Sequence, residues 1–219
     1  SGYFSGYSGC VPFLGVHALR SDQNIRNCYK LNLKVKEFIK NKNIKHLVLI
    51  SRWTYYTDGN NFGKNINYLN LKPSRSSNKK ISRIAFEKGL MDTLELYKKK
   101  KTNVFIIDQI PFQLADPKKI YYRSFDSNIE KFRKNLLKYS VDLNQHNNLQ
   151  NFVKKIFKKV EKKYSNLTFI NFNKTFCNDV VKKCLIGNEK NSFYSDTNHL
   201  SSKGAYLTKD KIENLIKSF

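Results

Sequence analysis

Three short apolar runs limit what this chain can fold into. They lie at 46–51 (His-Leu-Val-Leu-Ile-Ser), 103–107 (Asn-Val-Phe-Ile-Ile) and 167–172 (Leu-Thr-Phe-Ile-Asn-Phe). Such runs are typical of strands buried on both faces of a parallel sheet, because a strand with one solvated face would alternate apolar and polar residues. Helical patterns separate the runs. The sequence therefore predicts an α/β fold with a parallel sheet and right-handed connections.

The helical patterns consist of apolar residues three or four positions apart. They predict helices over 25–39, 84–97, 129–137 and 149–164. A last helix is expected after Ser201 or Ser202, either of which can cap it. Its apolar face would be formed by Leu207, Ile212, Leu215 and Ile216.

The length of 219 residues suits one domain, and no linker or low-complexity break divides the chain. We therefore expect a single domain over residues 1–219.

Residues 1–15 predict a short aromatic strand that runs into a Gly/Pro loop. Residues 54–82, rich in Asn, Gly, Ser and Lys, predict a long excursion above the sheet edge. No run approaches the roughly 18 apolar residues of a membrane span.

The formal net charge of +24 raises the question of nucleic-acid binding, because clustered Lys and Arg neutralise phosphates. Here the lysines are spread over nearly every segment, and Arg, the better reader of bases, is sparse. The accompanying excess of Asn and Ile is typical of an AT-rich genome. We therefore expect no nucleic-acid partner. The charge favours an attraction to anionic glycans or membrane surface over nucleic-acid binding, and salt would weaken either interaction.

The four cysteines form two local pairs, Cys10 with Cys28 and Cys177 with Cys184. Neither pair has the Cys-x-x-Cys spacing of a zinc knuckle or a thioredoxin site, and His17 and His46 are not placed to complete a tetrahedral set. This spacing favours two disulfides and no metal site. Four buried free thiols in a reducing compartment are the alternative.

A carboxylate and an imidazole lie three residues apart within 194–201 (Tyr-Ser-Asp-Thr-Asn-His-Leu-Ser). If the turn brings Asp196 to His199, the carboxylate holds one ring nitrogen as a donor and leaves the other to take a proton from a nucleophile. Leu200 would anchor this turn in the core. The alternative is ordinary turn chemistry at Asp196 and a surface histidine at position 199.

In open parallel sheets the ligand crevice lies beyond the carboxyl ends of the strands. Arg52 and Trp53 follow the first apolar run and are candidates for substrate binding, with a surface ion pair and a core ring as the respective alternatives. Gly9 can offer a backbone N–H to an oxyanion, because glycine lets the chain approach a ligand closely. A plain turn is the alternative there.

These motifs together resemble the SGNH/GDSL hydrolase superfamily, and in particular the extracytoplasmic SGNH domains fused to bacterial membrane sugar O-acyltransferases. Residues 196–201, with Gly-Ala at 204–205, resemble the Asp-x-x-His-Leu-Ser block of that family. Residues 8–12 (Ser-Gly-Cys-Val-Pro) resemble its Ser-x-Cys-Pro-Pro-like segment, and 51–53 (Ser-Arg-Trp) a strand that ends in Arg-Trp. Cys177 and Cys184 precede the last block as the paired cysteines of the family do.

The resemblance implies a flavodoxin-like three-layer sandwich with a central parallel sheet, and an enzyme that needs no cofactor. It implies that His199 is the general base, that Asp196 orients it, and that Gly9 donates to the oxyanion. The reaction would move an acyl group, such as acetyl, to or from hydroxyls of a cell-surface polysaccharide. A fused or associated membrane acyltransferase would supply the acyl group, and the domain would be periplasmic and tethered to the inner membrane.

Two motifs of the superfamily are missing: no Gly-Asp-Ser and no Gly-x-Asn-Asp occur in the 219 residues. We therefore expect a chain that is incomplete at its amino terminus, so that its sheet lacks the first strand and the nucleophilic serine lies upstream. The alternative is a degenerate, non-catalytic SGNH module that binds glycan or a membrane partner.

Overall fold

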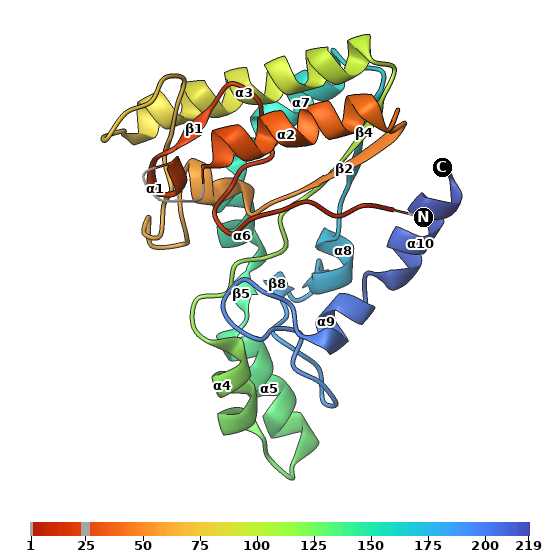
Figure 1. The fold of residues 1–219 in the computed structure, drawn as a ribbon. Coiled ribbons are helices and arrows are strands. Elements are labelled where there is room, and N and C mark those ends of the chain that lie inside the picture. The colour runs from red at the N-terminus through yellow and green to blue at the C-terminus, as the bar shows by residue number, and fades with distance from the viewer. Residues whose placement is uncertain (1, 23–26) are drawn as a thin grey trace. The chain divides into compact units, whose positions relative to one another are not determined.

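The computed structural model describes residues 2–22 and 27–219 (Figure 1). The chain forms two compact units. Unit 1 consists of Ser1–Gln109 and Gln150–Ile170. Unit 2 consists of Ile110–Leu149 and Asn171–Phe219. The chain therefore leaves unit 1 after its second long strand and returns for its last helix and strand.

The main sheet of unit 1 is parallel, as predicted. Its strands are β2 (His46–Ile50), β4 (Asn103–Ile107) and β6 (Leu167–Ile170), in the order β2-β4-β6. Val104 pairs with Leu47 on one side and Leu167 on the other, so β4 is central. The expectation that every run is buried on both faces is wrong for β2. This strand lies at the edge of the described sheet, where Leu49 is buried but Ile50 is 65% exposed.

The long helices of unit 1 are α2 (Cys28–Asn41), α3 (Lys79–Lys99) and α7 (Asn151–Glu161). Asparagine caps the first two, since the side chains of Asn27 and Asn78 each accept a backbone N–H three residues ahead. The apolar stripe of α7 is buried, as its spacing predicts, through Val153, Ile156, Phe157 and Val160. Ile25, which the predicted first helix included, lies outside the described residues.

The prediction of an aromatic strand near the amino terminus is wrong. Residues 2–16 contain no strand, and Tyr3 and Phe4 are 67% and 93% exposed. The glycines and serines interspersed there give the segment little to pack in a sheet.

Shorter elements complete unit 1. The strand β1 (His17–Ala18) pairs antiparallel with β3 (Leu69–Asn70), and α1 (Leu19–Asp22) follows β1. The predicted excursion after the first long strand holds a 3₁₀ turn, η1 (Trp53–Tyr56), and β3, and it ends where α3 begins at Lys79.

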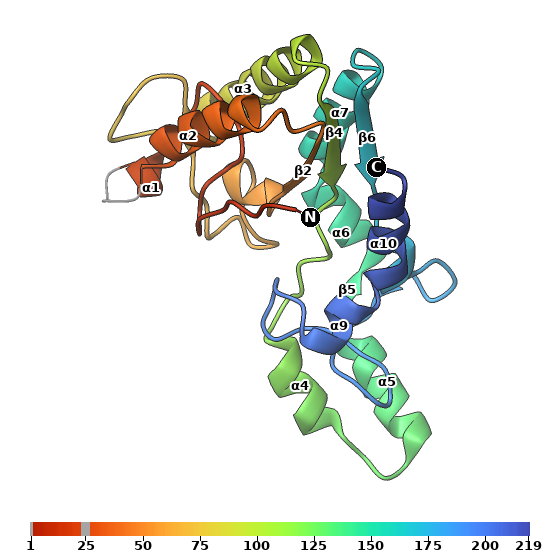
Figure 2. The ribbon, with the colours of Figure 1, turned by 45° about the vertical axis from the view of Figure 1, so that its right-hand side comes forward.

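Unit 2 is built from short elements. Its helices are α4 (Pro117–Ser124), α5 (Ile129–Tyr139), α6 (Leu143–Leu149), α8 (Asn173–Phe176), α9 (Ser202–Tyr206) and α10 (Lys209–Lys217). A small antiparallel sheet, in the order β5-β8-β7, joins β5 (Val141–Asp142), β7 (Cys177–Asn178) and β8 (Lys183–Cys184). Figure 2 shows α9 leading into α10 at the carboxyl end of the chain.

Two helix predictions are corrected here. The helix expected over 149–164 is α7, which is shorter at both ends, because Leu149 belongs to α6 and α7 runs only from Asn151 to Glu161. The last helix is divided into α9 and α10. In the described ranges, 2–22 and 27–219, none of the helices combines the length and apolarity that a membrane crossing requires.

Candidate active site

The turn that carries Asp196 and His199 is closed by a short antiparallel bridge. Tyr194 pairs with Leu200, and the N–H of Ser195 donates to the carbonyl of His199 at 2.9 Å. Leu200 was expected to anchor the turn, but it is only half-buried. Phe193 and Tyr194 are buried instead. The turn is therefore anchored by the two residues that precede it, and the imidazole lies in the loop that the bridge closes.

Both carboxylate oxygens of Asp196 are engaged within the turn. Its Oδ1 accepts the backbone N–H groups of Asn198 and His199, each at 2.8 Å. Its Oδ2 lies 2.6 Å from Nδ1 of the His199 ring. Because a carboxylate only accepts, this contact places the ring proton on Nδ1 and leaves the lone pair on Nε2.

The electrostatics of the pair favour an ionised Asp196. Partial burial by itself would raise its pKa, but the N–H groups of Asn198 and His199 and the His199 ring stabilise the charged form more strongly. The pKa of Asp196 therefore lies below the ordinary value of 3.8. The side chain of His199 is 72% exposed, so the ring is accessible to a reacting group.

Asn198 places its amide beside the same ring. Its Nδ2 lies 3.0 Å from Nδ1 and 3.4 Å from Nε2 of His199. Because Nδ1 carries the ring proton, the amide N–H cannot donate to it, and the distance to Nε2 is long for a hydrogen bond, so Nε2 is not firmly occupied.

A buried glutamine, Gln113, holds the turn by hydrogen bonds. The backbone N–H of Gln113 donates to the carbonyl of Thr197 at 2.8 Å. The Gln113 side chain donates to the carbonyl of Cys184 and accepts from the N–H of Val141, both at 3.1 Å. Gln113 thus joins the turn to two strands of the small sheet. Sequence reasoning missed it, because one polar residue after an Ile-Pro-Phe segment carries no periodic signal.

The start of α9 fixes the other end of the turn. The Ser201 hydroxyl accepts the N–H of Gly204 at 3.0 Å and donates to the carbonyl of Ser192 at 2.7 Å. Of the two predicted cap residues, Ser201 therefore caps the helix. A Cβ on Gly204 would lie 1.9 Å from the carbonyl oxygen of Phe193, so only glycine fits this contact.

A family model for SGNH domains fused to AT3 domains matches residues 1–214. This chain belongs to that family. No curated protein gave a significant match in a sequence comparison.

Solved structures similar to this SGNH domain include the periplasmic domain of a lipopolysaccharide acetyltransferase from Salmonella ser. Paratyphi A. The two share 18% identity and a TM-score of 0.54 over 87% of this chain and 64% of that structure. A GDSL-like lipase from Bacteroides thetaiotaomicron has 12% identity and a TM-score of 0.47 over 87% and 70% of the respective chains. The first similarity confirms the predicted α/β fold.

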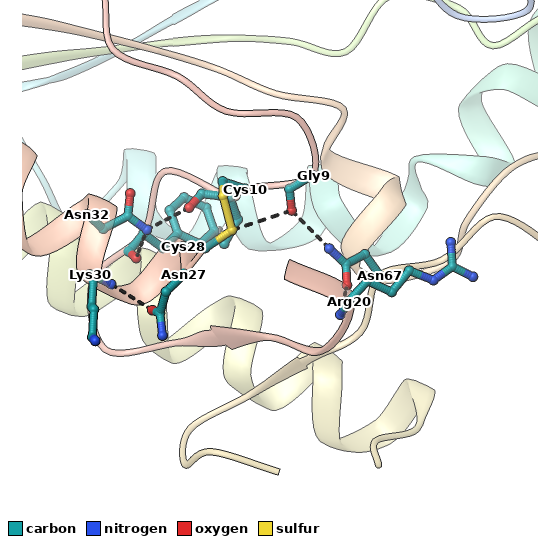
Figure 3. Close-up of a disulfide and its surroundings, with 10 residues drawn as sticks. Gly9, Cys10, Arg20, Asn27, Cys28, Lys30, Asn32 and Asn67 are labelled. Atoms are coloured by element: carbon teal, nitrogen blue, oxygen red, sulfur yellow. Dashed lines mark hydrogen bonds between the residues drawn. A yellow bond between two sulfur atoms is a disulfide. The ribbon is translucent and has the colours of Figure 1, made fainter. Parts of the chain in front are cut away.

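Both predicted disulfides are present in the SGNH domain, so the alternative of free thiols is wrong. Cys10 is bonded to Cys28, and Cys177 to Cys184. Figure 3 shows the first disulfide at the amino end of α2. The second lies across the small sheet, where Cys177 pairs with Cys184 in register. His146 lies near this second pair, but bonded cysteines offer no thiolate to a metal.

Gly9 takes a left-handed conformation, with φ of 79°, beside the first disulfide. Its carbonyl accepts a hydrogen bond of 2.9 Å from Nδ2 of Asn67 (Figure 3). These features are those of a glycine-dependent turn. An oxyanion role for its N–H stays a prediction.

Trp53 is a core residue of the SGNH domain. It is completely buried, its indole stacks on Phe13 at 5.6 Å, and its Nε1 donates to the carbonyl of Ile107 at 2.7 Å. A ring without an exposed face cannot support a sugar, so the interpretation as a substrate platform is corrected to that of a core ring. The guanidinium of Arg52 lies 4.1 Å from the ring centre of Tyr55, and its substrate role stays a prediction.

Proposed function

We propose that this SGNH domain is the acyl-transferring part of an acyltransferase or esterase. The acyl group would be acetyl. The domain would transfer it to, or remove it from, hydroxyl groups of a bacterial cell-surface polysaccharide. The observation that carries the proposal is the contact of 2.6 Å between Asp196 Oδ2 and His199 Nδ1, with the His199 ring exposed. The acetyltransferase among the similar structures supports the choice of acetyl.

The chemistry follows from the tautomer of His199. Nε2 takes the proton of a serine hydroxyl as the serine oxygen attacks the ester carbonyl, and the carbonyl π electrons move onto oxygen. When this tetrahedral intermediate collapses, the bond to the leaving alkoxide breaks and Nε2 returns the proton to that oxygen. A second hydroxyl, from the glycan or from water, then removes the acetyl group by the same steps. Asp196 stabilises the imidazolium that forms in each half.

The proposed nucleophile is the serine of a Gly-Asp-Ser motif, and the 219 residues contain no such motif. Neither Asp196 nor His199 forms an ester in this mechanism. Both serve a serine supplied by the polypeptide that carries the domain. The proposed source of acetyl groups is the AT3 membrane acyltransferase, and the proposed location is periplasmic, tethered at the inner membrane.

The missing Gly-Asp-Ser block also favours a second candidate, a non-catalytic module that binds glycan or a membrane partner. The two candidate functions can be distinguished by measuring acetyl-ester hydrolysis by the polypeptide that carries the domain. Acyl transfer predicts turnover that disappears in His199→Gln and persists in His17→Gln, a matched change at the residue that stacks on Tyr29. Glycan binding without turnover in the unmodified protein would instead support the non-catalytic module.

A further inference from the structure

Unit 2 contains a cavity of about 510 Å³ that involves neither Asp196 nor His199. Residues of α6, α8, β7 and α10 line it, together with Asn171 before α8 and Asp179 after β7. Its volume lies within the range of about 300–1,000 Å³ that holds small organic ligands.

Three asparagines supply the uncharged polar groups of this cavity: Asn147, Asn171 and Asn173. The Oδ1 of Asn173 lies 3.1 Å from Nε2 of His146, which fixes the direction of the amide. The Nδ2 of Asn173 has no hydrogen-bond partner within the part of the chain that the structure describes. Amides both donate and accept, so they match the hydroxyl groups of a saccharide.

The charges of the lining are two ammonium groups and one carboxylate. Lys211 donates from Nζ to the carbonyl of Asn171 at 2.6 Å, which holds its charge at the cavity. Lys174 forms no ion pair among residues 2–22 and 27–219, and the same is true of Asp179. The lining therefore has an excess positive charge and a cation that is available to an anion.

The rest of the lining is apolar. Leu143 is buried, and Cys177 contributes its half of a disulfide. Such surfaces suit the C–H faces of sugar rings, which a simple inorganic anion lacks.

We propose that this cavity binds an acidic saccharide. The sugar hydroxyls bond to the amides of Asn147 and Asn173, and a sugar carboxylate pairs with Lys174 and Lys211. The site holds a glycan away from the reacting centre. Saccharide binding at this cavity does not depend on the proposed acyl-transfer reaction. A role of the cavity in delivering the glycan for acetylation does rest on that proposed function.

The test is calorimetric titration of the protein with tetragalacturonate and with its fully methyl-esterified form, which has the same rings without the charge. We expect the acid to bind and the ester to bind at least about tenfold more weakly, since charge-assisted hydrogen bonds to carboxylate are lost. Lys174→Gln should weaken binding of the acid by a similar factor. Asn173→Ala should weaken binding of both ligands.

The matched control is Lys203→Gln, which removes the same charge from α9 outside the cavity. It should leave the affinity unchanged. Equal losses in Lys174→Gln and Lys203→Gln would overturn the proposal, because they would trace binding to the overall charge of +24. Failure to bind the acid, or equal affinity for acid and ester, would also overturn it. Acetyl-ester turnover in Lys174→Gln reports on the proposed reaction alone, so the two proposals fail separately.

Discussion

Oδ2 of Asp196 lies 2.6 Å from Nδ1 of His199, while Oδ1 of the same carboxylate accepts two backbone N–H groups of the turn. One side chain thus shapes the loop and sets the proton on the ring. These two tasks can be separated by mutation, because asparagine retains an acceptor oxygen and alanine does not.

Asp196→Asn should keep the turn but present an N–H group to Nδ1 and so favour the wrong tautomer of His199. We expect turnover to fall by about 10⁴-fold, the loss typical of such a change in a hydrolytic triad, with an unchanged melting temperature. Asp196→Ala should lose turnover as well and also destabilise unit 2, by about 1 kcal/mol for each lost hydrogen bond. Steady-state kinetics and thermal unfolding check both variants. Full activity in Asp196→Asn would show that the carboxylate has only a structural role.

Gly204→Ala should damage the site without touching its reacting groups. The added methyl would lie 1.9 Å from the Phe193 carbonyl oxygen, so the backbone before the turn must shift. We expect a loss of about 1–3 kcal/mol in unfolding free energy, measured by urea denaturation, together with reduced turnover. Gly2→Ala is the control, because its Cβ would meet no atom within 4 Å. Equal stability of the two variants would contradict the close packing of α9 on residue 193.

Trp53→Phe tests whether position 53 serves the core or the substrate. The variant leaves the carbonyl of Ile107 without its indole donor, in a buried position. We therefore expect about 1–3 kcal/mol of destabilisation and an unchanged KM. A higher KM with normal stability would instead restore the interpretation as a sugar-binding residue.

Loss of the two disulfides should have unequal effects. Cys10 and Cys28 are 18 residues apart, whereas Cys177 and Cys184 are 7 apart. Chain entropy predicts contributions of about 3 and about 2 kcal/mol, because the longer loop restricts the unfolded state more. Paired Cys→Ala variants, compared by hydrogen exchange within unit 1 and unit 2 separately, provide the measurement. A larger effect from the shorter loop would rule out chain entropy as the main source.

The sequence predicted the parts of the fold that depend on repeated patterns. The three parallel strands follow from continuous apolar runs, and the stripe of α7 follows from its spacing. The division between α6 and α7 was not predictable in this way. It falls at Gln150, a buried side chain whose Nε2 donates to the carbonyl of Gln109 at 3.2 Å, a contact 41 residues away in sequence.

The small sheet of unit 2 escaped prediction for a similar reason. Its strands β5, β7 and β8 have two residues each, too few to show alternation. The contact between Asp196 and His199 was predictable from the sequence, because both residues lie in one turn and a spacing of three residues keeps their side chains close. The contribution of Gln113 depends on three partners distant in sequence, which no local pattern records.

The most direct test of the catalytic pair is a double-mutant cycle on acetyl-ester turnover, with Asp196→Asn, His199→Gln and both changes together. Groups that act as one unit are strongly non-additive, so we expect the double variant to be no slower than His199→Gln alone. If the two losses multiplied, or if His199→Gln retained near-normal turnover, the claim that Asp196 and His199 form one catalytic unit would be contradicted.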